Sequence, residues 1–549
     1  MFTNHSNRLK TITYLTGLVT SFMFSSCTST QDDPIDLWMH GTYYDRGTYT
    51  TGWIGIDDGI IVETSENPKV SSTDSVEVTN QFIYPGFIDA HAHLVGYANA
   101  LHEVPLYGAQ SEEEIIQRIH TFLEANPDCE FVMGRGWDQN LFEGKQFPTH
   151  HKLSMAFANL PVVLSRIDGH GIWTNQLAMD QSGITADSKV DGGMVVLSDG
   201  LPTGVFIDNA ERLINTPTID FELFKERLLI AEEKCFEAGI TGICDAGLNH
   251  QSLMWLDSLY QMGVLKMPLY SMASMDEENL AYFSEWGPIH RDRFQVSSFK
   301  VYADGALGSR GACLLNPYHD APDHSGLLIQ TPEDFEKFAR EALAIGFQVN
   351  THAIGDSANR IILNTYSVVL DKGNQKRWRI EHAQIVNPED LETFREYNII
   401  PSVQPTHATS DMYWAEDRLG AERIQHAYSY QSLLKVGGVL PLGTDFPVED
   451  ISALKTFYAA VSRKDAKGYP EGGFRKEEGL TRIQTLEGMT HEAAYGQFQE
   501  DQKGRIDVGK FADFTILDTD LLNCDESQIL TSTITATYIR GESVYESKK

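Results

Sequence analysis

The run GFIDAHAH, residues 86–93, decides how the rest of the chain is interpreted. It joins a short apolar segment to two histidines, His91 and His93, and their spacing places both side chains on one face of a β-strand. Pairs of this kind also occur among packed core histidines, so the pair alone does not establish a metal site. Its meaning depends on whether other strands of the same fold end in similar residues.

Seven further apolar runs follow, and they alternate with helix-period stretches such as FEKFAREALAIG (335–346). This alternation is typical of parallel βαβ units. The runs are GITGICDA (239–246), MPLYSMAS (267–274), VSSFKVYA (296–303), GFQVNTH (346–352), RWRIEHA (377–383), IIPSVQP (399–405) and GVLPLGTD (438–445). Together with the first run they predict an α/β protein built on a closed (β/α)₈ TIM barrel.

The remaining segments predict a second domain and an insertion. Short β-type runs between residues 36 and 84 contain a hairpin signal at Asp58-Gly59, and similar runs return in 496–549. We therefore expect a small β-sandwich domain made from both ends of the chain. The barrel would cover 85–495, with an insertion at about 95–235 after its first strand that would lie over the mouth and serve as a lid.

The composition restricts the partners. The 549 residues contain 43 Lys+Arg and 77 Asp+Glu, a formal net charge of -34. Such a charge repels nucleic acid and anionic membrane surfaces, so a small-molecule substrate is expected and nucleic-acid binding is excluded. The six cysteines show no C-x-x-C spacing, which argues against a disulfide scaffold or a cysteine zinc site. The sequence leaves homo-oligomer formation open.

Residues 1–26 resemble the signal peptide of a bacterial lipoprotein. Basic residues precede the apolar run TITYLTGLVTSFMF (11–24), which is too short to span a membrane. The following FSSC, ending at Cys27, resembles a lipobox with Phe and Ser in place of the usual Leu and Gly or Ala. We expect lipidation of Cys27, a tether over 27–35, and secretion across the inner membrane to the cell envelope, on the periplasmic side or at the cell surface. Ordinary cleavage before an incidental Cys27 is the alternative.

Three later runs end in residues suited to binding a metal. His352 ends the fifth predicted strand, His382 the sixth and Asp445 the eighth. Because the carboxyl ends of barrel strands converge at one mouth, we expect these side chains to meet His91 and His93. Four imidazoles and a carboxylate suit zinc, with manganese or iron as alternatives.

The motifs as a set resemble the amidohydrolase superfamily, in particular amidohydrolase family 3 and its YtcJ-like metal-dependent hydrolases, a group that includes N-substituted formamide deformylase. They are PGFIDAHAHL (85–94), VNTHAIGD (349–356), RIEHAQ (379–384), LGTDFPV (442–448) and KGRIDVGKFADFTILD (503–518). The resemblance covers nearly everything after about residue 36. It implies a one- or two-metal site and hydrolysis of C–N bonds other than peptide bonds.

Two-metal members of this family also use a carboxylated lysine on the fourth strand, and Lys300 lies on the fourth run here. An ammonium group would be repelled by two cations, whereas a carboxylated lysine is an anion whose two oxygens can hold metals about 3.5–4 Å apart. The resemblance thus implies two divalent ions on His91, His93, Lys300, His352, His382 and Asp445. The alternative is one ion on His91, His93, His352 and Asp445, with Lys300 unmodified.

The resemblance also implies a mechanism in which a metal-activated hydroxide attacks the substrate carbonyl. Asp445 would be the catalytic residue, taking a proton as general base and returning it to the leaving amine as general acid. Ester hydrolysis, or isomerase or lyase chemistry on the same barrel, remains an alternative, as does a non-catalytic binding lipoprotein.

Four more residues are candidates for substrate contact because they lie in family-like or aromatic motifs: Trp137 in GRGWDQN, His170 in RIDGHGIWTN, Arg310 in ALGSRGA, and His407 after the seventh run. Ligand sites commonly have flat apolar walls with a few polar groups. Core packing, helix capping or a structural ion pair would explain each of these residues equally well.

Overall fold

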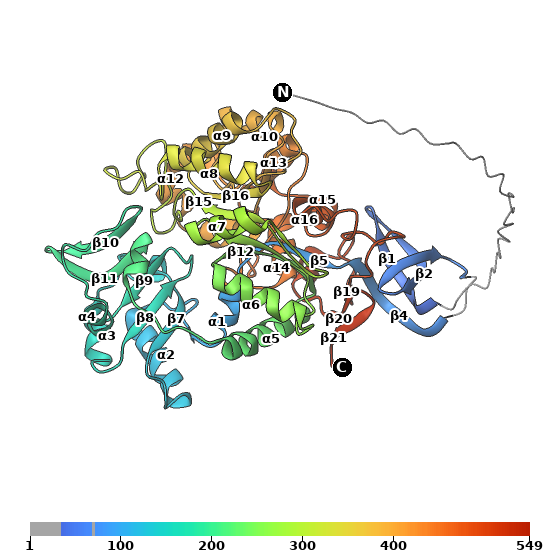
Figure 1. The fold of residues 1–549 in the computed structure, drawn as a ribbon, viewed down its shortest axis with the longest axis horizontal. Helices are drawn as coiled ribbons and strands as arrows, with labels where there is room; N and C mark the ends of the chain where they lie inside the picture. Colours follow the sequence, from blue (N-terminus) through green and yellow to red (C-terminus); the bar gives the residue numbers. More distant parts are fainter. Residues whose placement is uncertain (1–34, 69–71, 549) are drawn as a thin grey trace, which may run out of the picture.

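The computed structural model describes residues 35–68 and 72–548. The predicted signal peptide, Cys27 and nearly all of the tether lie outside these ranges. Figure 1 shows a central barrel between two smaller bodies, a sheet formed by the two ends of the chain and a sheet formed by the segment between the first two barrel strands. Within the described ranges no helix combines the length and the apolar character needed to cross a membrane.

Seven parallel strands form the barrel wall in the order of the sequence. They are β5 (Phe87–Ala92), β12 (Ile240–Leu248), β13 (Leu269–Ser274), β15 (Phe294–Tyr302), β16 (Gln348–Ala353), β17 (Arg379–His382) and β18 (Ile400–Ser402). Every neighbouring pair is parallel. A short strand, β14 (Ile289–His290), pairs antiparallel with β15 outside this series. The first seven predicted runs therefore form the expected strands.

The eighth predicted run, 438–445, forms no regular strand but occupies the gap between β18 and β5. On one side Gly443 N donates to Val403 O at 3.1 Å, and on the other Ala90 N donates to Leu442 O at 3.1 Å. The segment approaches β5 closely, since a Cβ on Gly443 would lie 2.5 Å from the backbone nitrogen of His91. These contacts bring the parallel sheet nearly to closure without a continuous ladder.

Helices cover the outside of the barrel, and α8 (Pro332–Ala344) shows why they form. The Thr331 side chain accepts a hydrogen bond from Asp334 N, a typical N-cap, and the apolar side chains of the helix are buried on one face. Phe338 packs edge-on against Phe299 of β15 at a ring distance of 5.2 Å. The other helices of the barrel are α5 (Phe221–Glu237), α6 (His250–Gln261), α7 (Glu277–Trp286), α9 (Asp356–Val369), α10 (Leu391–Glu396), α11 (Pro405–Asp411), α12 (Ala415–Arg423), α13 (Tyr430–Gly437), α14 (Ala453–Ser462), α15 (Arg482–Gly488) and α16 (His491–Gly496).

The two ends of the chain join one seven-stranded sheet. Its order is β21 (Glu542–Glu546), β20 (Ile534–Ile539), β19 (Phe514–Leu517), β4 (Ser72–Pro85), β1 (Ile35–Asp45), β2 (Thr48–Asp57) and β3 (Ile60–Ser65). The turn at Asp58-Gly59 has φ values of 47° and 74°, as a tight hairpin requires. The antiparallel pair of β4 and β19 joins the two ends. Division of this region into a β-sandwich remains a prediction.

The segment between β5 and β12 forms a six-stranded sheet with its own apolar core. The strand order is β10 (Gly193–Ser198), β11 (Leu201–Asp208), β9 (Gly171–Thr174), β8 (Val162–Arg166), β7 (Val132–Trp137) and β6 (Val104–Pro105). Its helices are α2 (Glu112–Ala125), α3 (His150–Ala156) and α4 (Gln176–Gln181), whereas α1 (Leu94–Ala100), directly after β5, packs against α5 and β12 of the barrel. We call this six-stranded sheet the inserted sheet. Its loops reach the barrel mouth, where they contribute to the cavity described next.

Candidate metal centre

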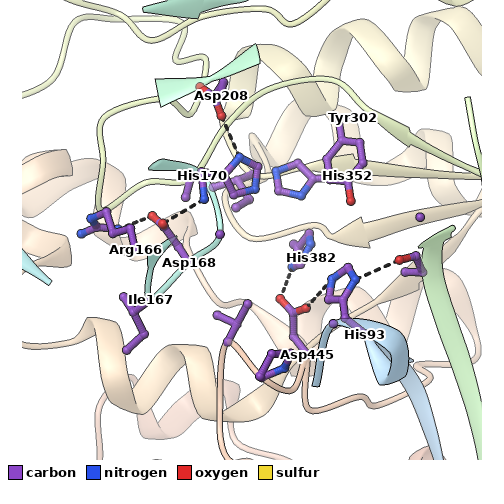
Figure 2. A pocket seen from close by; sticks show the side chains of 18 of the residues that line it. His93, Arg166, Ile167, Asp168, His170, Asp208, Tyr302, His352, His382 and Asp445 are labelled. Atoms are coloured by element: carbon purple, nitrogen blue, oxygen red, sulfur yellow. Dashed lines mark hydrogen bonds and ion pairs between the residues drawn. The ribbon is translucent and has the colours of Figure 1, made fainter. Parts of the chain in front are cut away.

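The predicted metal ligands meet at the carboxyl ends of the barrel strands. Ligand atoms of His91, His382 and Asp445 lie within 4.8 Å of one another. The Nε2 atom of His93 is 3.1 Å from Oδ1 of Asp445, and Nζ of Lys300 is 3.1 Å from Nε2 of His91. All of these residues except His91 line a cavity of about 880 Å³. Figure 2 shows His93, His382 and Asp445 close together in this lining.

A buried carboxylate orients His91. Its Nδ1 donates to Oε2 of Glu381 at 2.5 Å, and Arg379 donates to both oxygens of Glu381. All three side chains are fully buried. With Nδ1 engaged, the lone pair of His91 is on Nε2, which faces Lys300. A carboxylate behind a histidine in this way fixes its tautomer and strengthens it as a metal ligand.

Other polar groups orient His93 and His382. The Nδ1 of His93 donates to the carbonyl oxygen of Ala246 at 2.9 Å, so its Nε2 faces Asp445. The Nδ1 of His382 donates to Oε1 of Gln404 at 2.7 Å. His382 lies in the left-handed region with φ 72°, which ends β17 and turns its ring toward the centre.

His352 provides a direct test of whether a metal fits. Its Nε2 is buried, makes no hydrogen bond to any residue of the described ranges, and lies 3.7 Å from Oδ1 of Asp304. Its ring is 4.5 Å from that of His382. A buried polar nitrogen without a partner is costly unless a ligand occupies it. The set of nitrogen and oxygen donors around it suits a divalent ion such as zinc.

Burial keeps three imidazoles of this centre neutral, those of His91, His352 and His382. It lowers the pKa of His91 to about 4, and the positive charge of Lys300 is the next cause. Burial also holds the pKa values of His352 and His382 well below their usual value. Neutral imidazole is the form that binds metals, so these histidines are ready to act as ligands at neutral pH.

The pKa values of Asp445 and Lys300 are shifted as well. Burial alone would raise the pKa of Asp445, but the histidines around it, His93 first and then His91 and His382, hold it well below its usual range. Burial lowers the pKa of the Lys300 amine to about 8. The centre thus combines an ionised carboxylate with an amine that loses its proton far more readily than an exposed lysine does.

Two of the four predicted substrate residues line the cavity. His170, in the loop between β8 and β9, donates from Nδ1 to Oδ1 of Asp208 at 2.7 Å, and its ring lies 4.9 Å from that of His352. His407 lines another part of the wall, with Nε2 3.5 Å from Oδ2 of Asp445.

The other two lie away from it. Trp137 is buried in the core of the inserted sheet, where its indole donates to Leu164 O at 2.8 Å. Arg310 pairs with Asp320 at 2.9 Å. Neither is among the residues that line the cavity, so neither enters the functional proposal. The inserted sheet contributes other lining residues instead, among them Arg135, Asp138, Arg166, Asp168 and Arg212.

Sequence reasoning missed Glu381, Tyr302 and Arg166. Glu381 and Arg379 are two charged residues inside a short buried strand, and that pattern was the available signal. Tyr302 lies two positions after Lys300 and therefore faces the same side of β15. Arg166 is buried against Asp138 at 2.7 Å and against Asp168, within the RIDGHG motif.

Comparison with known proteins identifies relatives along nearly the whole chain. The profile of the family described as "Amidohydrolase family" matches residues 76–545. The chain is 29% identical over 526 residues to the putative amidohydrolase YtcJ of Bacillus subtilis (strain 168), covering 93% of this chain and 99% of that protein. It is 24% identical over 497 residues to the N-substituted formamide deformylase of Arthrobacter pascens, covering 86% and 90%. The crystal structure of an uncharacterized metal-dependent hydrolase from Pyrococcus horikoshii OT3 matches with a TM-score of 0.72 and 25% identity, covering 89% of this chain and 99% of that one.

Replacing Glu381 with Gln tests the support of His91. The neutral amide removes the charge between His91 and Arg379, so metal affinity should fall about 10- to 100-fold. Breaking a buried ion pair also costs about 3–5 kcal/mol of stability. Metal titration and thermal unfolding measure both effects. The control is Glu389→Gln, whose side chain is 82% exposed and which should change neither. Unchanged metal affinity in Glu381→Gln would contradict the proposal that Glu381 supports His91 as a metal ligand.

Proposed function

The chain belongs to the amidohydrolase family and is a metal-dependent hydrolase, and from this premise we propose that it hydrolyses a C–N bond other than a peptide bond in a small substrate. The observation that carries the proposal is the convergence of four buried or half-buried imidazoles, Asp445 and Lys300, all of which except His91 line one cavity. The similarity to N-substituted formamide deformylase supports an amide-type bond.

We assign two divalent ions to this centre, with zinc as the first choice and manganese or iron as alternatives. The residues that would hold them are His91, His93, Lys300, His352, His382 and Asp445. Such ions supply Lewis acidity and lower the pKa of bound water to about 7. A site with fewer ligands, built on His91, His93, His352 and Asp445, would hold one ion.

Carboxylation of Lys300 is chemically reasonable at this position. The reaction with carbon dioxide needs the unprotonated amine, and burial brings the pKa of this amine to about 8. The side chain is almost fully buried and touches His91 through Nζ. Among metal ions the ammonium form would be repelled, whereas the carboxylated form supplies an anion with two oxygens.

Asp445 is the proposed general base and acid. It is 4% exposed, lines the cavity, and stays ionised because His93 and His91 favour its charged form. It can therefore accept a proton from the attacking water and return it to the leaving nitrogen. Ester hydrolysis and isomerase or lyase chemistry on the same residues remain the alternative reactions. A binding lipoprotein without catalytic activity is the remaining alternative function.

Cys27 lies outside the described residues, and we propose lipid anchoring of the mature protein through it in the cell envelope. Mass spectrometry of the purified native protein should find a lipid on an N-terminal Cys27. Cys27→Ser should release active protein into the soluble fraction, because the barrel begins about sixty residues later. An unmodified mature N-terminus would contradict the anchor.

Elemental analysis and hydrolysis assays with N-formyl, N-acyl and cyclic amides test the reaction, and Asp445→Asn tests the base. The amide cannot accept and return the proton, so kcat should fall roughly 10²- to 10⁴-fold while the protein stays folded. His91→Ala should instead lose metal. The control Asp417→Asn changes an exposed carboxylate paired with Lys145 and should keep full activity. Near wild-type turnover in Asp445→Asn would reject this division of roles.

Lys300→Ala tests the proposal that carboxylated Lys300 bridges the two metal ions through its two oxygens. We expect at most one bound metal and loss of most activity, because the remaining ligands supply no anion between two ions. Short carboxylic acids should partly restore both by replacing the missing oxygens. The control is Lys372→Ala on the surface, where the lysine is 62% exposed. A Lys300→Ala protein with two metals and a normal rate would refute the bridge.

A further inference from the structure

Tyr302 carries a free hydroxyl group into the cavity. It ends β15 two residues after Lys300, so both side chains face the barrel lumen. Its hydroxyl makes no hydrogen bond to any residue that the structure describes, although Tyr302 lines the cavity. Other tyrosines near the site are bonded, as in Tyr430, whose hydroxyl donates to Gln404 O at 2.9 Å. Tyrosine hydroxyls inside proteins usually have a partner, so a free one facing a cavity points to a ligand.

The ring of Tyr302 is held in place by residues of the metal centre. It lies 5.4 Å from the ring of His352 and 6.1 Å from that of His170. The Nζ of Lys300 lies 4.8 Å from the ring centroid. Contacts from several directions leave the ring little freedom, so the hydroxyl has a defined position.

A glycine makes room for that hydroxyl. Gly247 has φ +81°, and a Cβ at this position would lie 3.0 Å from the hydroxyl oxygen of Tyr302. Gly247 directly follows Ala246, whose carbonyl oxygen orients His93. Figure 2 shows the hydroxyl directed from the ring toward His93 and His382. The donor therefore faces the place where a substrate group would meet the metal ligands.

We propose that Tyr302 is a further catalytic residue, which donates a hydrogen bond to the substrate oxygen on which negative charge develops during attack. This inference rests on the proposed hydrolysis of a carbonyl substrate. A phenol keeps its proton at neutral pH and donates without rearrangement. A donor already aimed at the developing charge stabilises the transition state more than the ground state. The substrate class it fits is one whose scissile group has an exposed carbonyl oxygen.

The variant Tyr302→Phe isolates the hydroxyl, because the ring and its contacts remain. Metal content and thermal midpoint should stay unchanged, and kcat and kcat/KM should fall together by roughly 10²- to 10³-fold with little change in KM. Binding of methylphosphonate, a stable tetrahedral oxyanion, gives a readout that does not depend on turnover. Its affinity for the metal-loaded protein, measured by calorimetry, should fall roughly tenfold to a hundredfold.

The control is Tyr469→Phe, which removes a hydroxyl from a tyrosine that is 56% exposed and lies outside the cavity lining. It should change neither readout. Equal methylphosphonate affinity in Tyr302→Phe and the wild-type protein would overturn the inference. Loss of metal in Tyr302→Phe would also overturn it, as would a wild-type protein that binds no methylphosphonate. If no C–N substrate is cleaved but methylphosphonate binding still requires the hydroxyl, the proposed bond is wrong and the donor role stands.

Discussion

One buried carboxylate links the wall of the barrel to the orientation of His91, the first of its predicted metal ligands. Glu381 lies between Arg379 and His91, with no exposure to solvent. Arg379 also donates to the carbonyl oxygen of Ala90 at 2.6 Å, which joins β17 to β5 across the lumen. A charge can be buried at this depth only if it is fully paired, so the three side chains depend on one another. Any rearrangement of the barrel wall would therefore disturb His91 directly.

Irregular backbone at the mouth places the reactive side chains. Asp445 is the last residue of the segment 438–445 and has φ 64°, and its backbone nitrogen donates to His91 O at 2.7 Å. A regular eighth strand would have continued past this point and alternated its side chains between the two faces. The turn instead sets the Asp445 carboxylate beside the Nε2 of His93. The predicted ligand His93 and the proposed base Asp445 are thus held together by the residues that bring the barrel nearly to closure.

The inserted sheet gives the cavity a polar wall. His170 lies beside His352. The buried ion pair of Arg166 with Asp138 stabilises the loop that carries His170. Arg418 of α12 donates to Oδ1 of Asn140 at 2.6 Å, which ties the inserted sheet to the barrel. This enclosed mouth and the net charge of -34 support the proposal that the substrate is a small molecule.

The sequence by itself determined seven barrel strands, their order, and which histidines and carboxylates lie at their ends, because apolar periodicity marks strands and parallel strands bring their carboxyl ends to one mouth. The tertiary structure alone decided that 438–445 brings the sheet nearly to closure without forming a strand, because its contacts with β18 and β5 are a few single hydrogen bonds. It also decided that His170 faces the cavity whereas Trp137 is packed in a separate core. The tertiary structure alone also showed that the hydroxyl of Tyr302 faces the cavity without a hydrogen-bond partner among the described residues. Such facts depend on contacts between residues far apart in the chain and on the direction of each side chain, which local spacing does not contain.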